Sequence, residues 1–495
     1  MDHGSGAERG RWQVTQSPHG AAPGTQNDAN LERVLALLDS RRTESLAELL
    51  EFASIPSVSA QSAHAPDMQR AAEWLAARLR LCGPLVAELW PTQGHPAVYA
   101  EWLGAPGAPT ILVYGHYDVQ PPEPLDRWKT LPFAPTVIGE RVYGRGVSDD
   151  KGPLLIAVQV ADAYFAATGG LPVNVKFLFE GEEEVGSVHL PALVAAQAGR
   201  LAADFVLSAD GGMWSAEIPS LTVSARGLAA LEFTVRGPAK DLHSGRHGGS
   251  LQNPLHAIAE LVASLHTPDG RVAVDGFYDG VTERGSAERQ ATARLPFSDA
   301  GYLAQTGAPE VFGEAGYSTL ERQWDRPTLE LNGLWGGYTA EGSKTVLPAE
   351  AHAKLTCRLV AGQEPGRILG LIEAHLSRHL PPGVTLDVRP GEHGARAYRI
   401  PEGHVGRRVA GEVLEQVYGV APLEVGMGGS IPVLETFQQL LGLDTVFFSF
   451  AVGDEDIHAP NEFFRLPRIA QGHQAWARYW ARLAEVGRAT ALQHG

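Results

Sequence analysis

The sequence predicts an α/β protein with a mostly parallel, helix-covered sheet, interrupted by an inserted α+β domain. In the first part of the chain, apolar runs of strand length alternate with helical apolar patterns, which is typical of parallel sheets covered by helices. From about residue 222, apolar and polar residues alternate one by one, as they do in half-exposed antiparallel strands. After about residue 401 the alternation of helices and strands returns.

The elements of the first part follow from the spacing of their apolar residues. The helix predicted to begin at Pro153 carries this proline in its first turn and is followed by Gly169 and Gly170, which are typical start and stop signals. Helices are predicted over 31–52, 68–81, 153–168 and 188–198, and strands over 97–103, 110–114, 173–179 and 205–208.

The inserted domain is predicted from strands with one apolar face. Leu231, Phe233 and Val235 alternate with polar residues in the strand 228–236. Further strands are predicted over 351–360 and 385–389, helices over 254–265 and 365–380, and no element over 269–340, which is rich in Gly, Pro and aromatic residues. Beyond the insertion, a helix is predicted over 402–417 and a strand over 446–450.

These patterns predict three parts of the chain. Residues 1–28 are rich in Gly, Ser, Gln, Asn and Pro without periodicity and predict a disordered leader. Residues 29–221 and 401–495 form the first domain, and 222–400 form the insertion. With 495 residues, the chain is long enough for at least two domains.

Composition narrows the class of function. With 40 basic and 57 acidic residues, the net charge of −17 argues against nucleic acid or an anionic membrane as partner. The two cysteines, Cys82 and Cys357, lie in apolar patterns and predict buried free thiols. The chain has no apolar run long enough to span a bilayer and no apolar N-terminal signal, so we expect a cytoplasmic protein.

Histidines and carboxylates follow the ends of the predicted strands. Because parallel strands place their carboxyl ends along one edge of a sheet, residues far apart in sequence meet there. Histidine and carboxylate ligands suit a pair of zinc or similar ions. The residues concerned are His116 and Asp118, the acidic run Glu182–Glu184, Asp210 and His458, together with Asp149 and Asp150 after the glycine-rich segment 144–146.

Each of these motifs also has an ordinary structural interpretation. His116 and Asp118 face the same way on an extended chain, so they form either a metal ligand with its hydrogen-bonding partner or a structural pair. Asp149 and Asp150 could cap a helix. The run Glu182–Glu184 could be a solvated face, but three adjacent carboxylates at a strand end repel one another unless a cation neutralises them. One of them could then serve as general base.

Further candidates lie outside this set. His243 stands in the motif Asp241–Gly245, and a turn with a capping histidine is the alternative. The glycines of 426–432 could let backbone N–H groups approach a ligand, or form an ordinary loop. Arg358 lies in an apolar segment, where it needs a carboxylate of the protein or of a substrate as partner.

Taken together, the ordered motifs resemble the M20 family of metallopeptidases, and within it the branch of cytosolic nonspecific dipeptidases and carnosinases. The resemblance covers about 350 of the 495 residues. The matching stretches are GHYDVQP (115–121), GRGVSDDKGP (144–153), FEGEEEVGS (179–187), SADGGMW (208–214), DLHSG (241–245), KTVLPA (344–349), GGSIP (428–432) and HAPNE (458–462).

The resemblance implies a di-zinc peptidase fold with an inserted lid and dimerisation domain, and a role for each matching residue. Glu183 would be the general base, Asp118 would orient His116, and His243 of the partner subunit in a homodimer would stabilise the oxyanion. Arg358 would hold the substrate's carboxylate, and Thr345, Gly429 and Ser430 would contact the substrate. The implied metal ligands are His116, Asp149 as the bridge, Glu184, Asp210 and His458, with a cis peptide between Asp149 and Asp150.

The implied function is hydrolysis of short peptides, in the first place dipeptides, with two divalent ions. Zinc suits the ligands, and manganese or cobalt are alternatives. An N-acyl-amino-acid deacylase or a desuccinylase of the same family would use the same chemistry on a different acyl group. A non-catalytic protein that binds metal or peptide is a further alternative, but it would have no use for a base such as Glu183.

Overall fold

The computed structural model describes residues 26–391 and 394–493, which form two compact units. The first contains the described residues up to Thr222, Ile400–Glu424, and those from Thr436 onward. The second contains the described residues of Val223–Arg399 and Val425–Glu435. The predicted leader lies outside the described residues up to residue 25, whereas residues 26–28 begin helix α1 (Gln26–Ser40).

The boundary after residue 400 differs from the predicted one. The segment Val425–Glu435, expected in the first domain, groups with the second unit. Its backbone accounts for this, because the Arg226 N–H donates to the carbonyls of Met427 and Gly429, both at 3.1 Å. The Arg226 side chain also donates through Nε to the carbonyl of Gly428 at 2.9 Å. A hydrogen-bonded loop of this kind does not show in the periodicity of the sequence.

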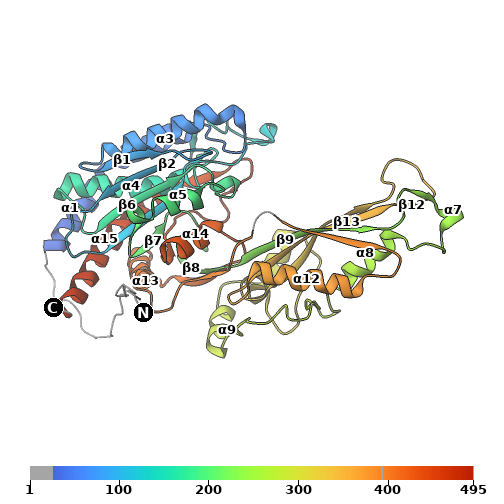
Figure 1. Cartoon of the computed structure of the whole chain (residues 1–495). Coiled ribbons are helices and arrows are strands. Elements are labelled where there is room, and N and C mark those ends of the chain that lie inside the picture. The colour runs from blue at the N-terminus through green and yellow to red at the C-terminus, as the bar shows by residue number, and fades with distance from the viewer. Residues whose placement is uncertain (1–25, 392–393, 494–495) are drawn as a thin grey trace, which may run out of the picture. The chain divides into compact units, whose positions relative to one another are not determined.

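The first unit is built on a six-stranded sheet in the order β1-β2-β6-β3-β7-β17 (Figure 1). β3 pairs in parallel with β6 and β7, and β7 pairs in parallel with β17. β1 and β2 form an antiparallel edge. The mostly parallel, mixed α/β sheet is therefore confirmed. The strands are β1 (Val86–Trp90), β2 (Ala97–Trp102), β3 (Thr110–His116), β6 (Asn174–Glu180), β7 (Phe205–Ser208) and β17 (Thr445–Phe447).

Helices cover both faces of this sheet. The Tyr114 ring of β3 packs edge-on against the Phe437 ring of α14 (Pro432–Leu441), with 5.3 Å between the ring centroids. At the next residue, Gly115, the nearest apolar side chain is Leu154 of α4 (Lys151–Thr168). Because successive residues of a strand point to opposite faces, α4 and α14 lie on opposite sides of the sheet.

α4 is buried from all sides, which explains why its sequence is apolar almost throughout. It contacts α1, α2 (Arg42–Ala53) and the long α15 (Leu466–Gln493), as well as β3. The predicted helix 31–52 is thus two helices that meet at Arg41, and the predicted helix 188–198 is α5 (Leu190–Ala196) and α6 (Ala198–Leu201). α3 (Ala65–Arg80) packs against β1 and β2, and α13 (Val405–Tyr418) against α15.

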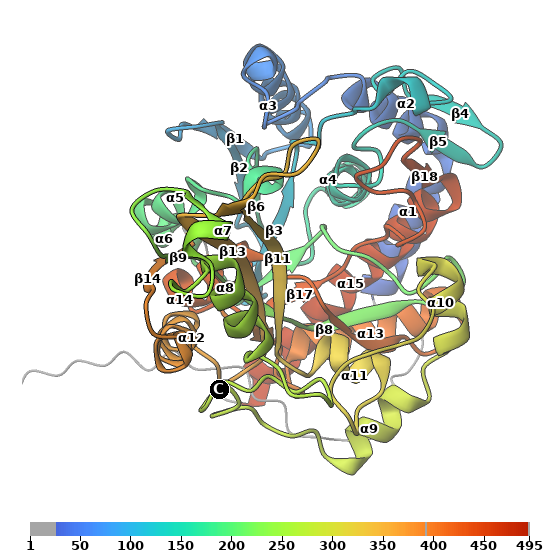
Figure 2. The same cartoon turned by 90° about the vertical axis from the view of Figure 1, so that its right-hand side faces the viewer.

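The second unit contains an antiparallel sheet in the order β11-β13-β9-β14, with α8 and α12 against it (Figure 2). Alternate residues of β9 and β13, including Phe233 and Leu355, form the core with these helices, as the alternating pattern predicts. The elements are β9 (Gly227–Arg236), β11 (Thr328–Gly336), β13 (Glu350–Leu359), β14 (Thr385–Pro390), α8 (Pro254–Ala263) and α12 (Pro365–His379).

β11 lies within 269–340, where the sequence pattern predicted no strand. It is an edge strand whose residues are mostly exposed, and its register shifts between Leu331 and Gly333. Such a shift breaks the alternation of apolar residues from which strands are predicted. The same stretch holds the short helices α9 (Ser286–Ala293), α10 (Asp299–Thr306) and α11 (Thr319–Trp324).

Smaller sheets fix the loops of each unit. In the first unit, β18 (Phe463–Arg465) pairs with β5 (Arg141–Tyr143), which pairs with β4 (Thr136–Ile138) (Figure 2). In the second unit, β10 (Leu242–His243) pairs with β12 (Val346–Leu347). A third sheet has the order β15-β8-β16, from Tyr398–Arg399, Ser220–Ala225 and Leu423–Met427.

The cysteines and the apolar character of the helices were also the subject of predictions. Cys82 and Cys357 are buried free thiols, as predicted. Within 26–391 and 394–493, no helix combines the length and apolar character needed to cross a membrane.

His473 of α15 should make the stability of the first unit depend on pH. Its side chain is 2% exposed, and Nε2 lies 2.8 Å from Gln159 Oε1. Burial lowers the pKa of His473 to about 4, so the unfolded chain binds a proton between this pH and about 6.5 that the folded chain does not. This contribution to stability is present above pH 6.5 and is lost as the pH falls.

We therefore expect His473→Gln to flatten the pH dependence of unfolding. Between pH 7 and 5, the metal-free wild-type protein should lose about 2 kcal/mol more stability than the variant, given a change of one proton over this range. Urea unfolding of both proteins at the two pH values measures the difference. Equal losses would show that His473 is not held neutral by the fold.

Candidate metal centre

Five ligand-type side chains come together at the carboxyl end of the parallel strands. His116 is the last residue of β3, Asp210 follows β7, and Glu184 lies in a single 3₁₀ turn (Glu183–Val185) after β6. Asp149 immediately precedes the first turn of α4, and His458 lies in the loop between β17 and β18. The edge of the sheet on which the sequence places these residues is therefore the edge at which they meet.

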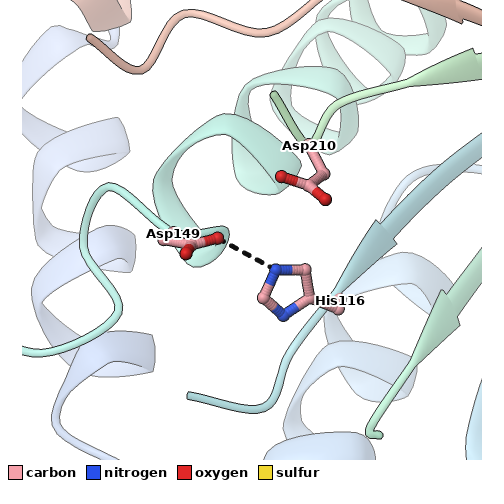
Figure 3. Close-up of side chains that lie close together, drawn as sticks. All are labelled: His116, Asp149 and Asp210. Atoms are coloured by element: carbon pink, nitrogen blue, oxygen red, sulfur yellow. Dashed lines mark hydrogen bonds and ion pairs between the residues drawn. The ribbon is translucent and has the colours of Figure 1, made fainter. Parts of the chain in front are cut away.

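His116, Asp149 and Asp210 form a first group of possible ligands. His116 Nε2 lies 3.0 Å from Asp149 Oδ1. Figure 3 shows the three side chains pointing toward one another from a strand end, a helix start and a loop. One potential ligand atom from each lies within 4.8 Å of the others. This spacing allows all three to contact one ion.

Asp149, Glu184 and His458 form a second group of the same kind. His458 Nε2 lies 2.9 Å from Asp149 Oδ2 and 3.1 Å from Glu184 Oε2. Glu184 also accepts a hydrogen bond from Gln120 Nε2 at 2.8 Å. Asp149 thus belongs to both groups, with one carboxylate oxygen directed to each histidine.

The electrostatics of the two groups suit cations. Burial and the neighbouring carboxylates raise the pKa of Asp210 to about 6, and the same causes raise the pKa of Glu183 well above its ordinary value. Hydrogen bonds to Asp149 and Glu184 raise the pKa of His458 to about 10. Each shift reflects negative charge gathered in a partly dehydrated place, which bound cations would relieve. Imidazole and carboxylate donors are the ligands that zinc, manganese and cobalt take.

Asp118 connects His116 to the glutamate turn. It is fully buried, and its Oδ1 lies 3.3 Å from His116 Nδ1, the ring nitrogen that faces away from Asp149. Its carboxylate also accepts the backbone N–H groups of Glu183 at 3.2 Å and Glu184 at 3.1 Å, and the Ser59 hydroxyl at 2.7 Å. The backbone carbonyl of Asp118 lies closer to His116 Nδ1, at 3.1 Å, so Asp118 contacts the histidine through its main chain as well as its carboxylate. Its side chain also holds the turn that carries two glutamates.

The remaining acids of the motifs have separate places. Glu182 is buried and pairs with His189 at 2.9 Å. The run Glu182–Glu184 holds one acid more than a metal site needs, and Glu182 is this additional acid. Asp150 is buried and accepts the backbone N–H of His116 at 3.2 Å through Oδ2. The Asp149–Asp150 peptide is cis, as expected. Glu183 is half-buried in the turn beside Glu184.

The other predicted site residues lie in the second unit, in two local clusters. His243 is exposed, and its Nδ1 accepts the backbone N–H of Gly245 at 3.0 Å. Thr345 lies beside it, because its carbonyl accepts the N–H of Ser244 at 3.0 Å. Arg358 of β13 donates from Nη1 to Ser430 Oγ at 3.0 Å, in the loop that contains Gly429.

Arg358 lacks the protein carboxylate that one interpretation of the sequence required. Throughout the part of the chain that the structure describes, no aspartate or glutamate oxygen lies within ion-pairing distance of its guanidinium. Its neighbour Arg226 adds to the positive charge, and burial together with Arg358 lowers the pKa of Arg226 to about 10. Among the described residues, the hydrogen-bond partner of the Arg358 side chain is the neutral Ser430 hydroxyl, so its positive charge is not neutralised by a described carboxylate.

Three residues that support the site were not singled out from the sequence. Gln120 contacts Glu184, Ser59 contacts Asp118, and Glu462 contacts the segment before Asp149. Gln120 and Glu462 lie in motifs that carry other candidates, so their proximity in sequence was an available signal. Ser59 is in no motif, and only the fold brings it to the site.

The chain is similar over most of its length to one family of peptidases and to individual proteins of known structure or name. The model of peptidase family M20/M25/M40 matches residues 112–482. Cys-Gly metallodipeptidase dug1 of Schizosaccharomyces pombe is 30% identical over 472 residues, which are 92% of this chain and 99% of the relative. An M20 family metallo-carboxypeptidase, Sso-CP2 of Sulfolobus solfataricus, has a TM-score of 0.78 at 30% identity, over 89% and 99% of the two chains. Human carnosine dipeptidase 1 has a TM-score of 0.76 at 26% identity, over 92% and 99%.

Proposed function

The chain belongs to the peptidase family M20/M25/M40, and from this we propose that it is a metal-dependent dipeptidase. The observation that carries the proposal is Asp149, whose two oxygens face two different groups of ligand-type side chains. Relatives named as dipeptidases support the substrate class.

Two divalent ions would be held by the five clustered side chains. His116 and Asp210 would hold one ion, Glu184 and His458 the other, and Asp149 both. When bound, such ions polarise a scissile carbonyl and lower the pKa of water. We propose zinc because imidazole and carboxylate donors suit it. Manganese and cobalt are alternatives, since the availability of the metal decides between them as much as the donor set does.

Glu183 is the proposed general base. It would take a proton from the attacking water and pass it to the leaving amine. The proton lost by the water therefore ends on the released amine, and the Glu183 carboxylate is restored. Its position in the turn is fixed by Asp118, which accepts the Glu183 N–H. The adjacent Glu184 is engaged with Gln120 and His458, so the two glutamates have different tasks.

The second unit is proposed to supply substrate contacts. Arg358 would pair with the terminal carboxylate of the peptide, with Ser430, Gly429 and Thr345 contacting the substrate nearby. An arginine that anchors the carboxyl terminus would select the peptide bond next to the C-terminal residue, which in a dipeptide is the only peptide bond. In a homodimer formed through this unit, His243 of the partner subunit would stabilise the oxyanion. The dimer and a cytoplasmic location remain predictions.

Glu183→Gln should abolish most of the hydrolysis without removing metal. General-base catalysis contributes about 10²–10⁴-fold, so turnover of a dipeptide should fall by that factor while the metal content stays the same. Glu182→Gln is the matched control, since it makes the same change one residue away, at a side chain paired with His189. Substantial turnover by the Glu183 variant would remove it from the mechanism.

Arg358→Ala should lower kcat/KM far more for dipeptides than for substrates without a free carboxylate. Loss of a charged hydrogen bond of about 1.5–3 kcal/mol predicts a fall of about 10- to 100-fold in kcat/KM for dipeptides, and little further change for their C-terminal amides. Lys354→Ala is the control, because this exposed lysine lies on the same strand and the same face.

The same assay separates the candidate functions. Tripeptides and N-acetyl and N-succinyl amino acids belong in the panel, with metal removed and then restored. Cleavage of dipeptides only when metal is restored supports the proposal. Cleavage of only the acylated amino acids would make the protein a deacylase. Cleavage of tripeptides with release of the C-terminal residue would favour a carboxypeptidase, as the archaeal relative is named, and no cleavage would favour a binding protein.

A further inference from the structure

The loop before Asp149 is wrapped around one buried carboxylate that has no assigned role. Glu462 is 1% exposed and accepts hydrogen bonds from four donors of this loop. Its Oε2 receives Arg145 Nη1 at 2.7 Å and the Gly146 N–H at 3.0 Å. Its Oε1 receives the N–H groups of Ser148 at 3.0 Å and of Asp149 itself at 3.3 Å. The proposed bridging residue is therefore directly hydrogen-bonded to Glu462 through its backbone.

A second buried glutamate of the same segment holds the residue next to Asp149. Glu455 is fully buried and accepts the Ser148 hydroxyl at 2.6 Å, the Val452 N–H at 3.0 Å and Arg465 Nη1 at 2.9 Å. Ser148 thus donates its N–H to Glu462 and its hydroxyl to Glu455. Two carboxylates from one segment fix this position from two directions.

The segment that carries these glutamates also carries His458. Three of the four non-glycine residues with positive φ in the described part of the chain lie in it, namely Asp456 at 53°, His458 at 62° and Asn461 at 72°. This backbone region is unfavourable for residues with a Cβ, so surrounding contacts must impose it. Asn461 supplies two such contacts, accepting the Lys129 N–H at 2.7 Å and donating to the Arg127 carbonyl at 3.0 Å.

A carboxylate suits this position in a way that a neutral group does not. All four donors point at oxygens that can only accept, whereas the amide of a glutamine would present N–H groups to two of them. A buried negative charge beside other carboxylates is costly, and Arg145 is the one cation that pairs with it among the described residues. An apolar core residue would avoid that cost but could not hold the loop.

From these contacts we propose that Glu462, assisted by Glu455, is a positioning residue that sets Asp149 at a fixed distance from His458 and so keeps the metal centre preorganised. The inference rests on the proposed function, because it concerns the same ions. Glu462 reaches Asp149 and Ser148 through backbone N–H groups, and its own chain leads to His458 four residues away. Its effect should therefore appear in metal affinity.

The test is the affinity of the metal-free full-length chain for zinc and manganese, measured by competition with a chromogenic chelator. Glu462→Gln should bind metal at least about tenfold more weakly than wild type, as loss of a ligand-orienting partner does. The measurement is made well below the unfolding temperature, with circular dichroism to show that the variant is folded. A wild-type affinity in the folded variant overturns the proposal.

Two further variants make the result specific. Glu314→Gln is the matched control, since Glu314 is a buried glutamate that pairs with the buried Arg326 in the second unit. It should leave metal affinity unchanged whatever it does to stability, and an equal loss of affinity in both variants overturns the positioning role. Ser148→Ala removes the contact with Glu455 and should lower affinity in the same direction, which tests the part of Glu455. Glu462→Asp keeps the charge but withdraws the carboxylate from the loop, so it decides the question if Glu462→Gln does not fold, and a wild-type affinity in it overturns the positioning role.

Asp149→Ala distinguishes failure of this inference from failure of the proposed function. If Asp149→Ala loses metal binding and Glu462→Gln does not, the metal centre stands and Glu462 has no part in it. If Asp149→Ala binds metal as wild type does, the proposed metal centre is itself wrong, and the positioning role falls with it.

Discussion

The rest of the site depends on one carboxylate that faces two ways. Asp149 directs Oδ1 to His116 and Oδ2 to His458, residues separated by more than 300 positions in the sequence. The negative charge gathered around it, from Asp210, Glu183 and Glu184, is unfavourable in a partly buried place unless cations are present. That conflict is the physical reason to assign metal chemistry to this edge of the sheet, independently of any relative.

The fold holds this carboxylate from several sides. β3 ends at His116, and α4 begins directly after Asp149 and Asp150 on one of the two helix-covered faces of the sheet. Lys151, fully buried, donates to the carbonyls of Ile55 at 2.7 Å and Phe52 at 3.2 Å, and so ties the start of α4 to the end of α2. Glu462 holds the preceding loop from the other direction. A site assembled from segments this far apart keeps its geometry only if each segment is anchored separately.

Much of this could be predicted from the sequence because the signals were local. Strand ends followed by His116, Glu184 and Asp210 placed the candidate ligands, and they meet in the structure. What could not be predicted depends on contacts distant in sequence. Glu184 is distinguished from Glu182 by its contacts with Gln120 and with His458, which lies far along the chain. The register shift of β11 against β13 hides the strand pattern, and the grouping of 425–435 with the second unit follows from hydrogen bonds to Arg226. No periodicity or composition carries that information.

Anomalous diffraction from crystals grown with zinc or manganese would test the shared role of Asp149 most directly. Two anomalous peaks per chain are expected, one beside His116 and Asp210 and the other beside Glu184 and His458, with an Asp149 oxygen in contact with each. A single peak, or two peaks that do not share Asp149, would contradict the two-ion centre.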